Sequence, residues 1–542
     1  QTPGDAAVLM VLKRHADAVR DGDEILAVMT TERVDDAPGL TLSLDATAPG
    51  LTPVFGHAHA ASGLLHVAGA VTACASRALP SRVGPMPWLP ASRERHARVH
   101  VTAGEGQSTT TDVRTASVSH AAPVLLGPAP RLGVFSADSM DGLVRALVQR
   151  DGTGQGAFRV AIVGETGAEY EQRVDRAVTL LRAHRDTSTV TIDDGIHFGT
   201  GPMAGELSFV FTGAAGAYAH MGRDLALAFP DLVDRFAARA GSLRDAASWV
   251  YSDDPDLQTT PSEKLWGASY LSQLHAEFTR GMLGLEPTAA IGYCSGETNS
   301  LFALDAWSDL DGFRRDVDAS RVYDRELCGE LLCVGRAWSL PAETPPSWAT
   351  WRVRAPVDQV RAAAAGEPRA HLVIINSPTD VVIAGDPEGC ARIAAVFGRK
   401  AVRTTGYDFV MHCPEASEFR SQWRALHHRP TSPVPGVRFY THATRSSYAP
   451  DIESVADALT GQAMNTVDFP GLVERAYADG VRVFIEHGPH AGCTKWIGDV
   501  LGAREHLAVA LDRYGHSSLF QALEGVARLA AAGVPVDHRA VT

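Results

Sequence analysis

The stretch AAIGYCSGETNSLFAL, residues 289–304, decides the fold. A short apolar run ends in a Gly-x-Cys-x-Gly turn, and an amphipathic segment follows without a break. This pattern is typical of a strand, a tight turn and a helix that together present a nucleophile above a sheet. Glycines flank the turn because larger side chains would collide with the neighbouring strand and helix. Cys294 is therefore the candidate nucleophile, and a buried cysteine in an ordinary strand–helix turn is the alternative.

The composition indicates a globular protein with more than one domain. Its 542 residues exceed what a single core covers, so roughly two to four domains are expected. The formal net charge of -14 argues against nucleic acid or an anionic membrane as the main partner. The 7 cysteines are scattered without a CxxC pair, which favours a reducing, cytoplasmic compartment and no zinc site. The chain starts at Gln1 and shows no secretory signal or membrane-spanning run, so we expect a piece of a longer protein.

The first residues predict part of a separate domain. Residues 4–14 predict an apolar strand that runs into a helix, and residues 21–29 predict a turn followed by a strand. The stretch FGHAHAASGLLHVAGAV, residues 55–71, predicts a helix with a face of small residues. These segments resemble the C-terminal third of a β-ketoacyl synthase, whose histidine element matches His57. The catalytic lysine and cysteine of the synthase have no counterpart, since Cys74 lies in a later helix, so we expect no condensing activity.

A linker and a small unit follow. Residues 86–130 are rich in proline, serine, threonine and glycine and predict an irregular linker with room for one strand pair. Beyond it the pattern predicts a βαβα unit that bridges large domains. Its strands are expected over residues 132–136 and 158–163, and its helices over residues 140–149 and 170–183.

A second large domain begins with a buried strand at residue 207. A helix over residues 265–283 precedes the turn at Cys294, and a strand over residues 481–486 closes the sheet. Between them, residues 348–406 predict a βαββαβ order, which is that of a ferredoxin-like insertion. Its strands are expected over 348–353, 371–375, 381–384 and 401–405, and its helices over 357–365 and 387–399.

Cys294 needs a base, and 21 histidines are available. His412, in the run FVMHCP, is the best candidate because it follows the last strand of the insertion, where the chain re-enters the cleft. A structural histidine in a loop is the alternative.

Five motifs in a fixed order resemble the acyltransferase domains of modular and iterative polyketide synthases and the malonyl-CoA:acyl-carrier-protein transacylases. They are FTGAAGAY with a following Met-Gly (211–222), GYCSGE (292–297), NSPTDVVIAG (376–385), MHCP (411–414) and FIEHGPH (484–490). The variants GYxSGETN and FGHAxAASG are most similar to the iterative synthases that build enediyne polyene precursors.

The resemblance implies an α/β fold with a hydrolase-like large subdomain that carries a parallel sheet and the nucleophile elbow. A ferredoxin-like small subdomain is inserted into it, and an α/β linker domain precedes it. The implied parts are a ketosynthase C-terminal remnant with linker (1–125), a ketosynthase–acyltransferase linker (126–206), the acyltransferase domain (207–525, insertion about 345–406) and a post-acyltransferase linker (526–542).

The resemblance also implies a ping-pong reaction. Cys294 would attack malonyl-CoA, and the phosphopantetheine thiol of an acyl carrier protein would then collect the malonyl group. His412 would move the protons, and the backbone carbonyl of Asn465 would orient its imidazole. The backbone N–H groups of Ser295 and Ala214 would hold the oxyanion, with the Ser295 side chain pointing away.

The free carboxylate of malonate calls for an arginine, which offers a planar donor that is always charged. The resemblance implies Arg325, with Arg321 as its rival, and the losing residue would lie on a solvated helix face. Met411 would crowd an α-methyl branch, which favours malonyl. Tyr293, beside the nucleophile, is the remaining substrate-binding candidate.

No permanently bound cofactor and no metal are implied; the expected partners are malonyl-CoA, an acyl carrier protein domain and the ketosynthase domain of the same polypeptide. Antibiotic biosynthesis in the cytoplasm would be the setting. Where relatives use serine, Cys294 would form a thioester close in energy to that of CoA, and it is either native or a Ser→Cys replacement. Two rivals stay open: a thioesterase or hydrolase on the same elbow, and a catalytically impaired fragment that only docks partners.

Overall fold

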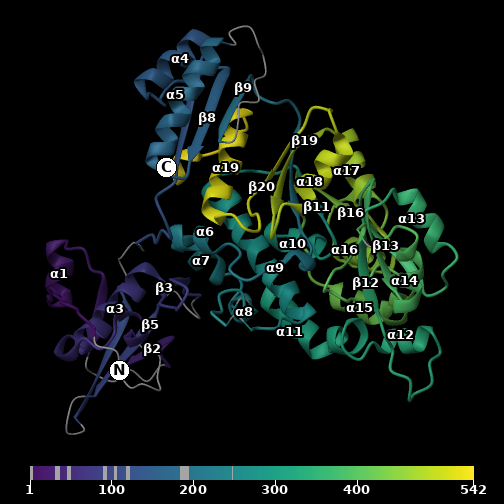
Figure 1. The fold of residues 1–542 in the computed structure, drawn as a ribbon, viewed down its shortest axis with the longest axis horizontal. Helices are drawn as coiled ribbons and strands as arrows, with labels where there is room; N and C mark the ends of the chain where they lie inside the picture. The colour runs from purple at the N-terminus through teal and green to yellow at the C-terminus, as the bar shows by residue number, and fades with distance from the viewer. Residues whose placement is uncertain are drawn as a thin grey trace. The chain divides into compact units, whose positions relative to one another are not determined.

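The computed structural model describes residues 4–30, 37–44, 51–89, 94–102, 107–116, 122–183, 195–246, 248–254, 256–398 and 400–542 (Figure 1). The chain forms two compact units. One holds Gln1–Gly127 and Gly222–Leu257, and the other holds Pro128–Met221 and Gln258–Thr542. The division into four parts made from the sequence stays a prediction.

The first unit is built on a four-stranded sheet in the order β1-β6-β5-β2. Helix α3 packs against this sheet through small buried residues, among them Ala70, Ala73 and Cys74. The sheet strands are β1 (Ala27–Thr30), β2 (Leu40–Ser43), β5 (His96–Thr102) and β6 (Ser108–Thr115). The other elements are α1 (His15–Asp21), α2 (Thr52–Phe55), η1 (His59–Ala61), α3 (Ser62–Ser76), β3 (Ala78–Leu79), β4 (Met86–Pro87), α6 (Arg223–Ala228), α7 (Pro230–Ala237) and α8 (Ser242–Ala246).

One prediction for this unit was wrong, and another was right only in part. Residues 4–14 contain no strand: Leu9 and Val11 are 92% and 93% exposed, and no described strand pairs with the segment. Within residues 86–130, the expected strand pair is present as the antiparallel β5 and β6, but it forms the centre of the sheet and is not part of an irregular linker. The threonine run of β6 looks like a polar loop in sequence, but β-branched side chains fit a pleated, half-buried surface.

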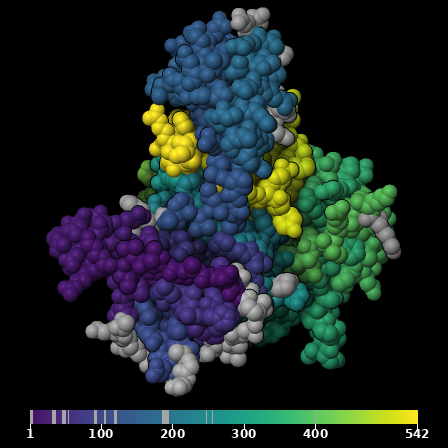
Figure 2. Space-filling model, turned by 60° about the vertical axis from the view of Figure 1, so that its left-hand side comes forward, coloured from purple at the N-terminus to yellow at the C-terminus, as the bar shows by residue number. Residues whose placement is uncertain are grey.

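The second unit begins with a small antiparallel sheet in the order β7-β8-β9. The strands β7 (Arg131–Ala137), β8 (Phe158–Gly164) and β9 (Ile196–Thr200) are accompanied by α4 (Met140–Gln149) and α5 (Gly167–Ala183). The strands and helices predicted over 132–183 are thereby confirmed. Helix α19 (Ser518–Ala531) also packs on this sheet, so that in Figure 2 yellow C-terminal atoms lie against the blue ones.

The main sheet has six strands in the order β17-β16-β11-β10-β19-β20. All neighbouring pairs are parallel except β16 and β17, which confirms the α/β class with a parallel sheet. Strand β11, which leads to Cys294, lies in the interior of the sheet. The strands are β10 (Glu206–Phe211), β11 (Ala289–Gly292), β16 (Arg438–Thr441), β17 (Ser446–Tyr448), β19 (Val481–His487) and β20 (Leu507–Ala510).

Helices surround this sheet, and α9 is deeply buried where it approaches the elbow. A capping box between Thr260 and Glu263 fixes its start, and every residue from Leu265 to Ala276 is buried. The helical elements are η3 (Ala214–Gly216), α9 (Pro261–Ala276), η4 (Glu277–Met282), α10 (Gly296–Ala303), α11 (Leu310–Ser320), η5 (Tyr323–Leu327), α12 (Leu332–Ala337), η6 (Pro414–Phe419), α15 (Arg420–His427), α16 (Ile452–Met464), α17 (Phe469–Ala478), α18 (Gly492–Leu501) and η7 (His538–Val541).

The inserted subdomain has the predicted βαββαβ order. Its elements are β12 (Ala349–Val353), α13 (Val357–Ala364), β13 (Ala370–Ser377), β14 (Asp380–Gly385), α14 (Pro387–Ala395) and β15 (Val402–Thr404). The sheet order β15-β12-β14-β13-β18 adds one short strand, β18 (Val467–Asp468), which pairs in parallel with β13. This strand follows α16, so the chain joins the two subdomains a second time after the insertion.

No described helix is both long and apolar enough to cross a membrane. Nor do three histidine, cysteine, aspartate or glutamate side chains of the described ranges gather as a metal ion would require.

The two glycines of the elbow generate a stability prediction. A methyl group added to Gly292 would lie 2.1 Å from the backbone nitrogen of Glu297, and one added to Gly296 would lie 2.0 Å from the carbonyl oxygen of Phe211. Backbone atoms cannot yield without opening the turn. We expect Gly292→Ala to lower the free energy of unfolding by about 2–3 kcal/mol, measured by denaturant titration.

The matched control is Gly498→Ala in α18, where nothing lies within 4 Å of the added methyl group. This change should raise the free energy of unfolding by about 0.5–1 kcal/mol, because alanine favours a helix over glycine. Equal stability of the two variants would contradict the close packing of the elbow.

Candidate active site

Cys294 occupies the turn between β11 and α10. Its φ of 55° lies in the left-handed region, which a side chain other than glycine adopts rarely. The turn is closed by two backbone hydrogen bonds: the N–H of Gly296 donates to the carbonyl of Tyr293 at 2.9 Å, and that of Glu297 to the carbonyl of Cys294 at 3.1 Å. The strand–turn–helix pattern seen in the sequence is therefore present, with the nucleophile position in a strained conformation.

His412 lies directly opposite. Its Nε2 is 3.2 Å from the Sγ of Cys294, although 118 residues separate them in the chain. The histidine is buried, and it too has a positive φ, 65°. Two residues that lie far apart in the chain are thus held in strained backbone conformations at hydrogen-bond distance, which is typical of functional sites.

The end of helix α16 orients the imidazole. The last carbonyls of a helix lack partners within it, and three of these are used here. The carbonyl of Gln462 accepts from His412 Nδ1 at 2.8 Å, and that of Ala463 accepts from the backbone N–H of His412 at 2.7 Å. The third, of Gly461, accepts from the side-chain amide of Asn465 at 2.7 Å.

The expected contact of Asn465 was therefore wrong. Asn465 follows the last helical residue, Met464, and its own backbone is extended, whereas the carbonyl of Gln462 is still directed along the helix axis. The position of the imidazole at the negative end of a helix dipole also favours a positive imidazolium.

Burial keeps both reacting groups neutral at rest. It raises the pKa of Cys294 to about 11, and a hydrogen bond from the backbone N–H of Ser295 lowers this pKa only in part. Burial likewise lowers the pKa of His412 to about 4, partly offset by the hydrogen bond to the carbonyl of Gln462. Near neutral pH the pair is a thiol beside a neutral imidazole, so that the histidine can accept a proton when the sulfur attacks.

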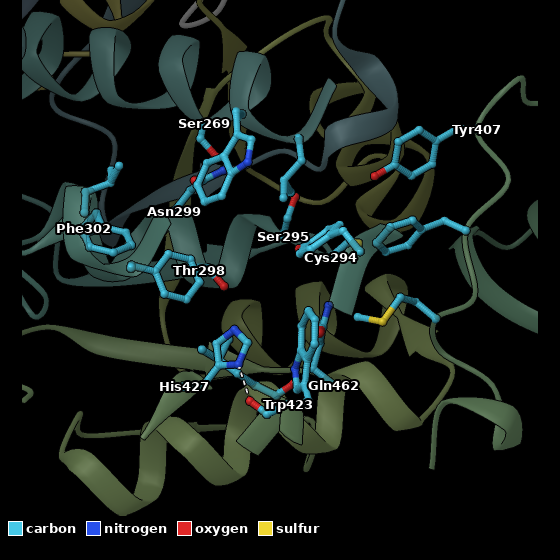
Figure 3. A pocket seen from close by; sticks show the side chains of 18 residues that line it. Ser269, Cys294, Ser295, Thr298, Asn299, Phe302, Tyr407, Trp423, His427 and Gln462 are labelled. Carbon is cyan, nitrogen blue, oxygen red and sulfur yellow. Dashed lines mark hydrogen bonds between the residues drawn. The ribbon is translucent and has the colours of Figure 1, made fainter. Parts of the chain in front are cut away.

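The candidate oxyanion donors lie around the sulfur. Ser295 precedes α10 and Ala214 begins η3, so neither N–H has a partner within its own helix. The loop before Ala214 comes close, since a methyl group added to Gly213 would lie 3.3 Å from the Cβ of Cys294. The Ser295 side chain does not point away as expected: it lines the pocket beside Cys294, and its hydroxyl has no hydrogen-bond partner in the described structure (Figure 3).

A pocket with a cavity volume of about 40 Å³ adjoins Cys294 (Figure 3). Met411 lines it, as the sequence predicted, together with side chains that are mostly apolar or aromatic. The others are Leu265, Trp266, Ser269, Ser295, Thr298, Asn299, Phe302, Leu310, Phe313, Tyr323, Tyr407, Phe409, Trp423, His427, Leu459 and Gln462. Most of these walls were missed, because only their helical spacing marks them and buried core residues share that spacing.

Three predicted substrate contacts are absent from this pocket. Arg321 and Arg325 have side chains 59% and 51% exposed, near acidic neighbours, and neither lines the pocket. Arg321 follows the last residue of α11 in a left-handed conformation and Arg325 lies in η5; of this segment, Tyr323 lines the pocket. Tyr293 points to the other side of the elbow, where its hydroxyl donates to Asn376 at 2.8 Å. The substrate-binding roles of these three residues stay predictions.

The pKa values generate a prediction for chemical reactivity. Because Cys294 is a thiol with a raised pKa, its alkylation by iodoacetamide should accelerate by about tenfold per pH unit between pH 7 and pH 9. Site-resolved mass spectrometry would follow the reaction, with Cys294→Ser as the control for the other cysteines. A rate that is already maximal below pH 7 would instead reveal a thiolate–imidazolium pair and contradict the neutral resting state.

No family model matches the chain, but it is similar to several known proteins. It is 27% identical over 275 residues to a polyunsaturated fatty acid synthase from a Thraustochytrium species, covering 47% of this chain and 13% of that protein. It is 25% identical over 405 residues to the polyketide synthase GfsB of Streptomyces halstedii, covering 70% of this chain and 7% of that protein. The chain thus spans only a small part of these relatives.

Solved structures give the wider match. The acyltransferase domain from module 8 of the salinomycin polyketide synthase aligns with a TM-score of 0.58 at 20% identity, covering 76% of this chain and 98% of that one. The acyltransferase domain of an iterative polyketide synthase in enediyne biosynthesis aligns with a TM-score of 0.51 at 20% identity, covering 76% and 98%. The chain therefore has the fold of polyketide synthase acyltransferase domains, with a hydrolase-like large subdomain and a ferredoxin-like small one.

Proposed function

We propose that this chain is an acyltransferase of a polyketide-type synthase, which moves an acyl group from a CoA thioester to the phosphopantetheine thiol of an acyl carrier protein. The observation that carries the proposal is the 3.2 Å contact between Cys294 Sγ and His412 Nε2 on a nucleophile elbow. The fold and the names of the relatives support it.

The proposed reaction is two thioester exchanges. Cys294 attacks the thioester carbonyl carbon of the acyl-CoA while its proton passes to His412 Nε2, and the departing CoA sulfur takes that proton back. The carrier thiol then gives its proton to His412 and attacks the acyl-cysteine, whose sulfur leaves and is reprotonated. Both steps exchange one thioester for another, so neither needs an additional reactant.

The surroundings of the pair suit this chemistry. The carbonyl of Gln462 would stabilise the imidazolium that forms when His412 accepts the proton. The N–H groups of Ser295 and Ala214 would hold the charge that develops on the carbonyl oxygen. The apolar lining next to the sulfur would limit the access of water, which favours transfer over hydrolysis.

The wider setting belongs to the same proposal. The first unit would be the remnant of a ketosynthase. The ketosynthase and the carrier domain would belong to the same polypeptide as this chain, in the cytoplasm. The synthase would be of the enediyne type and would act in antibiotic biosynthesis. The resemblance names malonyl as the acyl group, and Met411 favours it over methylmalonyl. Its carboxylate would need Arg321 or Arg325; because neither lines the pocket, malonyl is not part of the proposal.

Transfer of a labelled acyl group from acyl-CoA to a carrier protein tests the proposal. Cys294→Ala should abolish transfer, and His412→Ala should slow it by about 10²–10⁴-fold, because it removes the general base. Asn465→Ala should change the rate by less than about threefold, since that side chain only caps α16.

A separate control measures release of free acid without a carrier protein. Hydrolysis as fast as transfer would establish the thioesterase alternative. No acylation of Cys294 and none after Cys294→Ser would leave only a docking role and contradict the proposal.

A further inference from the structure

The acyl pocket beside Cys294 has a chemistry that points to its substrate. We propose that it accepts an uncharged acyl chain carrying a hydroxyl or keto oxygen, and that it excludes malonyl and other carboxylate-bearing acyl groups. This inference rests on the acyl transfer proposed above and names the substrate class of the same site.

The described residues that line the pocket include no arginine and no lysine. The histidine among them, His427, donates from Nδ1 to the carbonyl of Trp423 at 2.7 Å, and burial lowers its pKa to about 4. This lining therefore holds no positive charge near neutral pH. A carboxylate in this pocket would lose its hydration without gaining a cation, which is strongly unfavourable.

Two guanidinium groups lie behind the aromatic wall. Arg314 stacks over the ring of Trp266 at 5.6 Å, and Arg429 over that of Phe313 at 5.5 Å. Neither arginine lines the pocket, and Arg429 already forms an ion pair with Asp316 at 2.5 Å. The rings of Trp266 and Phe313 therefore present only a neutral surface to a substrate.

The depth of the pocket suits a chain longer than malonyl. Its lining residues run from Cys294 to Phe302 in α10, and the six helical steps from Gly296 to Phe302 correspond to roughly 9 Å. Phe302 and Phe313, whose ring centroids are 5.7 Å apart, form part of the apolar wall far from the nucleophile.

Unpartnered hydrogen-bond donors lie buried in residues of this apolar wall. The indole N–H of Trp266, the side-chain amide of Asn299 and the hydroxyl of Ser295 are buried without a partner in the described structure. All three residues line the pocket, and Figure 3 shows Asn299 on the side of Phe302, farther along than Ser295. A buried donor left unsatisfied is costly, and a ligand oxygen would satisfy it. Neutral donors match a neutral hydroxyl or keto oxygen.

The test is a competition among hexanoyl-, 3-hydroxyhexanoyl- and malonyl-CoA for the whole chain, followed by intact mass spectrometry. Malonyl should acylate at least about 100-fold more slowly than hexanoyl, and the hydroxyl group should accelerate acylation by about 3- to 10-fold. Malonyl acylation as fast as hexanoyl, or its loss in Arg314→Ala or Arg429→Ala, would overturn the inference. Absence of every adduct would overturn the proposed acyl transfer itself.

Two variants separate charge from shape. Thr298 lies one helical turn after Cys294 and lines the pocket, so Thr298→Arg should raise malonyl acylation by at least about tenfold. Thr298→Gln, similar in reach but uncharged, is the control and should not. Trp266→Phe should remove the preference for 3-hydroxyhexanoyl over hexanoyl, measured as the ratio of the two acylation rates in that variant; an unchanged ratio would overturn the part assigned to the donors.

Discussion

The turn between β11 and α10 is the constraint on which the site depends. The chain reverses within a few residues, which places a side chain in the left-handed region at Cys294 and leaves no room for a Cβ at Gly292 or Gly296. The buried parallel neighbours of β11 hold this turn in place. Because the backbone geometry fixes the sulfur of Cys294, His412 and the oxyanion donors need to be directed at that one position only.

The end of helix α16 at Gln462 fixes the position of His412 in the same way as the turn fixes that of Cys294. His412 is fixed to α16 by both its ring and its backbone N–H, and α16 is followed at once by β18, which joins the sheet of the inserted subdomain. The same burial that positions the pair also keeps it uncharged. A thioester exchange suits such a pair, since charge is needed only while the proton is in transit.

The sequence predicted the features that depend on local residue patterns. It missed the features that depend on the direction in which a side chain or a backbone carbonyl points. The elbow, the inserted subdomain and His412 follow from glycine spacing, strand order and a short motif. Asn465 was the wrong partner because a spacing in sequence does not show which carbonyl at a helix end faces the ring. Nor does the sequence show that Tyr323, between Arg321 and Arg325, is the residue of this segment that lines the pocket. The aromatic pocket wall comes from several separate helices and loops, which no single periodicity reveals.

Peptide mapping after rapid quenching of the chain with an acyl-CoA tests the central claim most directly, because it identifies the residue that carries the acyl group. The account predicts a single acyl thioester on Cys294 that hydroxylamine releases and that does not form in Cys294→Ala. An acyl group on another residue, or one that persists in Cys294→Ala, would contradict it.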